Sequence, residues 1–130
     1  MSDGNPSDLV IAHLAAFTSG DLTELLATLA ADAVFVSGTT LITPSDFAEF
    51  FGWAIREIQP RIRLQSVVSE AGNVACQFVE TVTVEGQQRQ LNRAAFYTVA
   101  DGLISSVKVY GVHSGDCGQP LRLIPDMRSG

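Results

Sequence analysis

Residues Asn73–Val112 read NVACQFVETVTVEGQQRQLNRAAFYTVADGLISSVKVYGV, and they predict three strands lying side by side. Apolar and polar residues alternate over parts of these segments, for example at Val82-Thr83-Val84 and Val107-Lys108-Val109, as in half-buried strands. The expected strands are Val74–Val84, Arg89–Val99 and Leu103–Val112. Glu85-Gly86 and Asp101-Gly102 separate them, and an X-Gly pair between alternating segments is typical of a β-hairpin. The stretch therefore predicts an antiparallel meander.

Polar residues stand inside this meander where a plain core strand would carry aliphatic side chains, notably Glu80, Asn92 and Arg93. By strand alternation, Glu80 shares a face with Phe78. A two-residue hairpin turn places Phe78 opposite Arg93, with Glu80 one diagonal step away and within reach of the long arginine side chain. A turn one residue longer would instead point Asn92 inward and Arg93 outward.

Helical patterns dominate the first half of the chain. Ser7 is expected to cap a first helix that Gly20 ends, and Asp21 to cap a second helix. Thr43-Pro44 predicts the start of a third helix that runs to about Ile58. Two further strands are expected at Ala33–Ser37 and Ile62–Ser69. The order α-α-β-α-β-β-β-β predicts an α+β layer architecture.

The bulk composition sets limits on the class of protein. A chain of 130 residues predicts one domain over residues 1–130, with a flexible lead at 1–6 and a loop-like tail at 113–130. The net charge is −6 without a Lys/Arg cluster, which argues against nucleic-acid and anionic-membrane partners. The N-terminus has no basic region followed by an apolar core, so a cytoplasmic location is expected. A mean hydropathy of +0.22 predicts that a second subunit covers some apolar surface.

Cysteine and histidine usage gives no sign of a metal or cofactor. The two cysteines, Cys76 and Cys117, are too few for a disulfide framework, and there is no CxxC or HExxH motif. His113, Asp116 and Cys117 follow the last strand without an evident orienting third group, so a Cys-His nucleophile is not expected. The prediction is a protein that uses no metal and no cofactor.

Two segments resemble a known superfamily. Ser19-Gly20-Asp21-Leu22, continued by LAADAVF at Leu29–Phe35, resembles the "G-D … ADDAxF" opening of NTF2-like (SnoaL-like, ketosteroid-isomerase-like) proteins. Asp101–Tyr110 resembles their closing "DGKI…WRDYF" hairpin. The resemblance spans about residues 8–112 and implies a curved antiparallel sheet wrapped around helices, a cone with an internal cavity. It also implies frequent homodimers, and a choice of functions among isomerases, cyclases, dehydratases, epoxide hydrolases and non-catalytic modules.

The residues depart from the enzymes of this superfamily. Where the resemblance to ketosteroid isomerase implies a Tyr and two Asp residues, this chain has His13, Ser37 and Ala95, so that activity is rejected. The limonene-epoxide-hydrolase type implies Arg-x-Asp on the third strand, where the chain has Phe78-Val79-Glu80. It also implies an Asp on the last strand, as do polyketide cyclases, and that position holds Val109. The chain therefore uses a rearranged site or performs no chemistry.

Three residues are candidates for catalysis. Apolar neighbours of Glu80 would disfavour its ionised form and make it a usable general acid or base; alternatively it is paired with an arginine or lies on an exposed rim. Arg93 could polarise a substrate oxygen, or form a structural clamp with Glu80. His13 falls in the apolar stripe of the first helix. Its unperturbed pKa near 6.5 suits proton transfer, although a lone core histidine is more often a structural donor.

Further side chains could bind a small, mostly apolar organic ligand in the cavity. The aromatic candidates are Trp53, Tyr97, Phe17 and Phe50, and the polar ones are Ser37 and Asn92. Core packing explains the aromatic residues equally well. Three hypotheses follow: a cofactor-free acid/base enzyme, a non-catalytic small-molecule binding protein, and a dimeric structural module whose cavity is filled by side chains. All three share an apolar convex sheet face that would serve as a dimer interface: Val79, Thr81, Thr83, Ala94, Phe96 and Val112.

Overall fold

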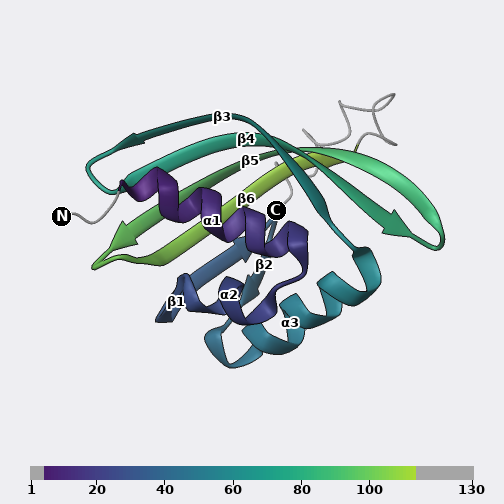
Figure 1. Cartoon of the computed structure of the whole chain (residues 1–130), viewed down its shortest axis with the longest axis horizontal. Helices are drawn as coiled ribbons and strands as arrows, with labels where there is room; N and C mark the ends of the chain where they lie inside the picture. Colours follow the sequence, from purple (N-terminus) through teal and green to yellow (C-terminus); the bar gives the residue numbers. More distant parts are fainter. Residues whose placement is uncertain (1–4, 114–130) are drawn as a thin grey trace.

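The structure is a computed structural model that describes residues 5–113. Figure 1 labels its α-helices and strands. In chain order the elements are α1 (Pro6–Ser19), α2 (Leu22–Ala27), β1 (Leu29–Ser37), β2 (Thr40–Ile42), a 3-10 turn (Pro44–Asp46), α3 (Phe47–Trp53), a π-helical turn (Ala54–Ile58), β3 (Arg61–Glu70), β4 (Asn73–Val84), β5 (Gln87–Ala100) and β6 (Leu103–His113). Of the predicted tail, only His113 lies inside the described part, where it ends β6. Asp116 and Cys117 lie outside it.

The first helix begins two residues earlier than predicted. Asn5 is its cap, because the Asn5 side chain accepts a hydrogen bond from the backbone N–H of Ser7 at 3.0 Å. The prediction of Ser7 as the cap was wrong; its hydroxyl donates to the same Asn5 oxygen at 2.9 Å. Gly20 ends the helix in the left-handed conformation with φ 79°, as expected of a C-cap glycine. Asp21 caps α2 as predicted, by accepting from the Glu24 N–H at 3.1 Å.

The third helical segment changes its winding along its length. It opens with the 3-10 turn, continues as α3 and ends in the π-helical turn. Thr43 precedes it in extended conformation, but its hydroxyl binds the Asp46 carboxylate at 3.0 Å instead of capping a backbone N–H. Gln59 then adopts φ 52° and Pro60 follows, so the helix stops where the sequence predicts.

Within the described residues, six strands form one sheet in the order β2-β1-β6-β5-β4-β3. Strands β3 to β6 form the predicted antiparallel meander. Two features were not predicted. Thr40–Ile42 forms the short strand β2 beside β1, and β1 pairs with β6 in parallel, with Phe35 beside Val107. The sheet is therefore mixed rather than wholly antiparallel.

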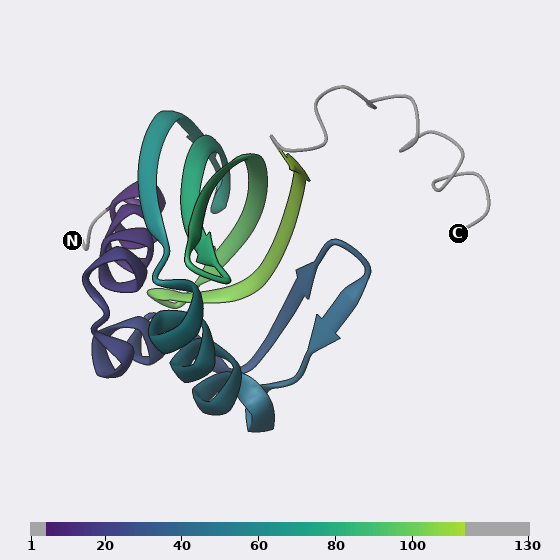
Figure 2. The ribbon, with the colours of Figure 1, turned by 90° about the vertical axis from the view of Figure 1, so that its right-hand side faces the viewer.

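The sheet is strongly curved, and the helices lie against its concave face (Figures 1 and 2). Strands β3 to β6 arch over α1 and α3 (Figure 1), while the β1–β2 hairpin extends the sheet beyond β6 and stands at the right in Figure 2. The core fills the space between the two layers. Its most buried large side chains are Leu25, Ile104, Val10, Val74 and Val107. The predicted α+β fold with a curved sheet around helices is confirmed.

No helix among the described residues has both the length and the apolar character needed to cross a bilayer.

Candidate functional site

A cavity of about 200 Å³ lies between the helices and the concave face of the sheet. Its walls are mostly apolar and aromatic, with a few polar groups directed into it. The polar groups in the lining are His13, Ser37, Glu80, Arg93 and the phenol of Tyr97. Such a lining, with few polar groups in an apolar cavity, is typical of small-molecule sites.

The lining contains every site residue predicted from the sequence except Asn92. Phe78 pairs with Arg93 across β4 and β5, as the two-residue turn requires, so Arg93 points into the cavity. Its neighbour Asn92 points to the opposite, convex side because successive side chains of a strand alternate. Asn92 is exposed there and was wrongly included in the site.

Glu80 and Arg93 form an ion pair inside the cavity. Arg93 Nε donates to Glu80 Oε1 at 3.0 Å, and the two side chains are only 22% and 12% exposed, respectively. Because both side chains are mostly shielded from solvent, the carboxylate charge would be costly to bury alone, and the guanidinium compensates it. Gly111 of β6 lies opposite Arg93 and leaves room for it, since an added Cβ would approach Arg93 Cδ to 2.7 Å.

His13 is buried in α1, and its Nδ1 forms a hydrogen bond with the Thr28 hydroxyl at 2.8 Å. The Thr28 hydroxyl in turn donates to the Leu25 carbonyl at 2.6 Å. Burial lowers the pKa of His13 to about 4, because the charged imidazolium loses its hydration. The expectation of an unperturbed pKa near 6.5 was wrong, and the ring is neutral at physiological pH. Sequence patterns did not single out Thr28, since nothing in them relates it to His13.

Tyr97 and Cys76 are neighbouring neutral donors. Burial raises the pKa of Tyr97 well above its usual value, and the nearby Cys76 and Glu80 act in the same direction. Burial likewise raises the pKa of the free Cys76 thiol to about 11, although the neighbouring Tyr97 acts in the opposite direction. The phenol therefore stays protonated in the cavity wall.

An aromatic cluster makes up much of the remaining wall. Phe35 and Phe51 join the predicted Phe17 and Phe50 in the lining, with Phe35 and Phe51 in edge-to-face contact at 5.2 Å between ring centres. Both were absent from the predicted site because helical or strand spacing cannot separate cavity walls from core. Trp53 is 45% exposed and ends α3, so it lies at the edge of the cavity.

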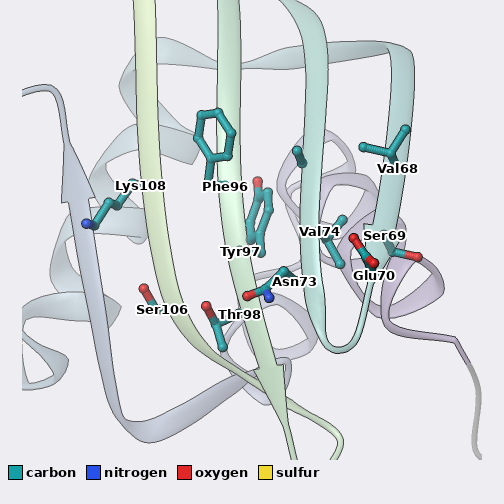
Figure 3. A pocket seen from close by; sticks show the side chains of 11 residues that line it. Val68, Ser69, Glu70, Asn73, Val74, Phe96, Tyr97, Thr98, Ser106 and Lys108 are labelled. Atoms are coloured by element: carbon teal, nitrogen blue, oxygen red, sulfur yellow. The ribbon is translucent and has the colours of Figure 1, made fainter.

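A second depression, of about 520 Å³, lies on the convex side of the sheet, with the helices behind it in Figure 3. Figure 3 shows Phe96 and Lys108 on neighbouring strands, with Val68 and Glu70 on β3 at the other side. Its polar side chains are largely exposed to solvent, so water competes with any ligand for them. The inner cavity, where polar groups are desolvated, is therefore the candidate site.

A family model for the SnoaL-like domain matches residues 10–107, well over half of the chain. The chain belongs to the SnoaL-like domain family. The matched residues include His13, Glu80 and Arg93 of the cavity. A comparison with curated proteins finds no significant match.

Solved structures with the same fold include proteins that are named for different activities. IdmH from Streptomyces antibioticus, a proposed polyketide cyclase, is 20% identical, with a TM-score of 0.73 over 83% of this chain and 92% of that chain. An LEH-like epoxide hydrolase of M. tuberculosis is 17% identical, with a TM-score of 0.76 over 82% of each chain. A proposed polyketide cyclase from Pseudomonas putida KT2440 is 27% identical, with a TM-score of 0.71 over 83% of this chain and 92% of that chain. These likenesses confirm the NTF2-like fold.

The cavity of this SnoaL-like chain differs in its ionisable groups from what the resemblance to epoxide hydrolases and cyclases implies. Val109 lines the cavity at the position where the resemblance to epoxide hydrolases and cyclases implies an Asp. The chain instead offers one carboxylate already paired with a guanidinium, and one neutral imidazole. Among the described residues, no three His, Cys, Asp or Glu side chains gather where they could hold a metal ion. The groups present can accept or donate protons and can stabilise negative charge.

Proposed function

We propose that the chain binds a small, mostly apolar organic molecule in the inner cavity and acts on it by cofactor-free acid/base chemistry. One observation carries the proposal: a neutral His13 and the Glu80–Arg93 pair enter the same aromatic-walled cavity. His13 and Glu80 would accept or deliver the proton. Arg93 would stabilise negative charge that develops on a substrate oxygen.

The reaction class is an isomerisation, cyclisation, dehydration or epoxide opening. The names of the structural relatives support this range, since they include a proposed polyketide cyclase and an epoxide hydrolase. That support is an analogy between folds, and it does not choose among the reactions.

The size of the cavity favours small ligands. Its volume of about 200 Å³ is below the roughly 300–1,000 Å³ usual for sites that bind drug-sized molecules. We therefore expect molecules of one or two rings, such as monoterpene epoxides or short polyketide fragments. A four-ring steroid is too large for this cavity without rearrangement of its walls.

The test is a thermal-shift screen against steroids, polyketide fragments, terpenes and epoxides, followed by product analysis for each compound that raises the melting temperature. Trp53, the single tryptophan, gives a second readout because it lies at the edge of the cavity. Glu80→Gln should abolish turnover of a hit. Glu70→Gln is the matched control, since Glu70 is an exposed carboxylate on the convex side. Equal turnover in wild type and Glu80→Gln would contradict the assigned role.

A second candidate function is non-catalytic binding of the same kind of ligand. The ion pair favours it, because each charge of Glu80 and Arg93 is already matched before a ligand arrives. Binding without any product across the screen would support this function and would reject the enzyme.

We also propose that the chain forms a homodimer through the convex face of its sheet. Exposed apolar side chains on that face support the proposal: Val34, Leu41, Val68, Phe96 and Tyr110. Of the residues predicted for this face, Phe96 is 51% exposed, whereas Val79 is buried and would contribute little. The side chain of Val112 lies outside the described part of the structure. A cytoplasmic location stays a prediction from the sequence.

A further inference from the structure

The ring of His13 is held by a chain of hydrogen bonds whose direction can be assigned. The Thr28 hydroxyl lies 2.6 Å from the Leu25 carbonyl oxygen and 2.8 Å from Nδ1 of His13. A carbonyl oxygen only accepts, so Thr28 donates its single hydroxyl proton to Leu25. Towards the imidazole, Thr28 can then only accept. The proton of the neutral ring is therefore on Nδ1.

In this tautomer Nε2 of His13 carries no proton, and its lone pair can accept a hydrogen bond. Within residues 5–113, Nδ1 has the only hydrogen bond of the ring, and the ring lines the cavity. Tyr97 and Phe51 pack edge-on against the imidazole, with ring centres 6.1 Å and 6.4 Å away. Side chains packed in this way resist a rotation that would exchange the two nitrogens.

We propose that Thr28 is a positioning residue that makes His13 a hydrogen-bond acceptor, so that the cavity selects ligands whose inner end carries an O–H or N–H donor. The inference rests on the proposed function, because it names the substrate class of the same cavity. A ligand without a donor would leave Nε2 dehydrated and unpaired. A site with a buried polar group discriminates against a ligand that fails to pair with it.

The tautomer can be tested without a ligand by ¹⁵N NMR of the imidazole. In wild type near neutral pH, we expect a protonated Nδ1 and an unprotonated Nε2 for His13, with its signals assigned by their absence in His13→Gln. Thr28→Val removes the acceptor, so the proton should move to Nε2. Thr28→Ser keeps the hydroxyl and should restore the wild-type tautomer. A proton on Nε2 in wild type would overturn the inference even if Thr28→Val does not fold.

The selectivity can be tested with two matched pairs of two-ring probes. Indole carries an N–H donor that indene lacks, and quinoline carries an acceptor nitrogen that naphthalene lacks. Wild type should bind indole about fivefold more tightly than indene, the effect of one net hydrogen bond, and should not prefer quinoline over naphthalene. Thr28→Val should lose the preference for indole and gain one for quinoline, whereas Thr28→Ser should bind as wild type does.

The outcomes separate this inference from the proposed function. Wild type that binds indene as tightly as indole overturns the selectivity while leaving an apolar small-molecule site in place. If none of the four probes binds, the proposed function fails for ligands of this size, and the selectivity fails with it. A Thr28→Val protein that keeps the wild-type preference for indole shows that Thr28 does not position His13.

Discussion

His13 links the stability of the molecule to pH. Its pKa is about 4 in the folded protein, against 6.5 for an exposed histidine. The unfolded chain therefore binds this proton more tightly than the folded one. The stability that depends on burying His13 as a neutral ring is fully present above pH 6.5 and is lost as the pH falls from about 6.5 to about 4. The loss amounts to about 3 kcal/mol of unfolding free energy.

The measurement is urea unfolding of wild type and His13→Gln at several pH values across that range. His13→Gln should show a clearly shallower loss of unfolding free energy with acid, because glutamine does not titrate. The acidic residues are the same in both proteins, so the difference between the two curves isolates the histidine. Parallel curves would show that His13 is not buried as a neutral ring.

The Glu80–Arg93 pair predicts a strongly non-additive mutant cycle. Arg93→Met leaves a carboxylate without its partner in a mostly buried place and should cost about 3 kcal/mol of unfolding free energy. Glu80→Gln leaves the guanidinium uncompensated and should also destabilise. The double variant should recover part of the loss, because neither charge remains. Purely additive losses in chemical denaturation would show that the pair contributes no coupling energy.

Site residues could be predicted where a local pattern constrains them. Strand alternation and a two-residue turn placed Glu80 and Arg93 correctly, and helical spacing turned His13 inward. The contact of Thr28 with His13 could not be predicted, because the two residues meet only when α1 and the end of α2 pack together. The pKa of His13 was predicted wrongly for a related reason, since desolvation depends on the whole surrounding shell of side chains.

At the scale of elements, strand β6 makes room for a side chain of β5. Gly111 is paired with Arg93, and a Cβ there would come within 2.7 Å of Arg93 Cδ and within 2.9 Å of the Asn92 carbonyl oxygen. Gly111→Ala should therefore displace Arg93 from Glu80 and destabilise the fold by about 1–3 kcal/mol, the usual effect of overpacking. Chemical denaturation measures the loss, and thermal-shift titration with a ligand from the screen measures the damage to the cavity.

Gly52→Ala is the matched control for this prediction. Gly52 lies in α3, and an added Cβ would meet its nearest neighbours at an ordinary 3.6 Å. Alanine should stabilise this position by about 0.5–1 kcal/mol, since it favours the helix. If both substitutions had the same effect, the close approach at Gly111 would not be the cause.

Apart from β2, the order of helices and strands followed from the sequence, but part of the sheet topology did not. Hairpins between neighbouring strands are signalled by their turns, so β3 to β6 were predicted in the right order. The parallel pairing of β1 with β6 joins segments far apart in the chain, and no local pattern specifies it. The strand β2 was missed because Thr40–Ile42 is only three residues long, too short for periodicity to register.

For the molecule as a whole, the convex face of the sheet predicts the quaternary structure. Phe96 and Tyr110 lie side by side on it, with ring centres 5.9 Å apart, and each is about half exposed. A stable dimer interface buries about 800 Å² per partner around an apolar centre with aromatic anchors. The convex face supplies such anchors, whereas the concave face is already covered by the helices.

Phe96→Glu should therefore turn a dimer into a folded monomer, because two carboxylates would face each other or be buried without partners in the interface. Sedimentation equilibrium gives the mass, and far-UV circular dichroism verifies that the variant is folded. Ile11→Glu is the matched control, since Ile11 is an apolar residue of α1, 40% exposed, on the other side of the sheet. A monomeric wild type would reject the dimer outright. A dimer that survives Phe96→Glu but dissociates in Ile11→Glu would move the interface from the sheet to the helices.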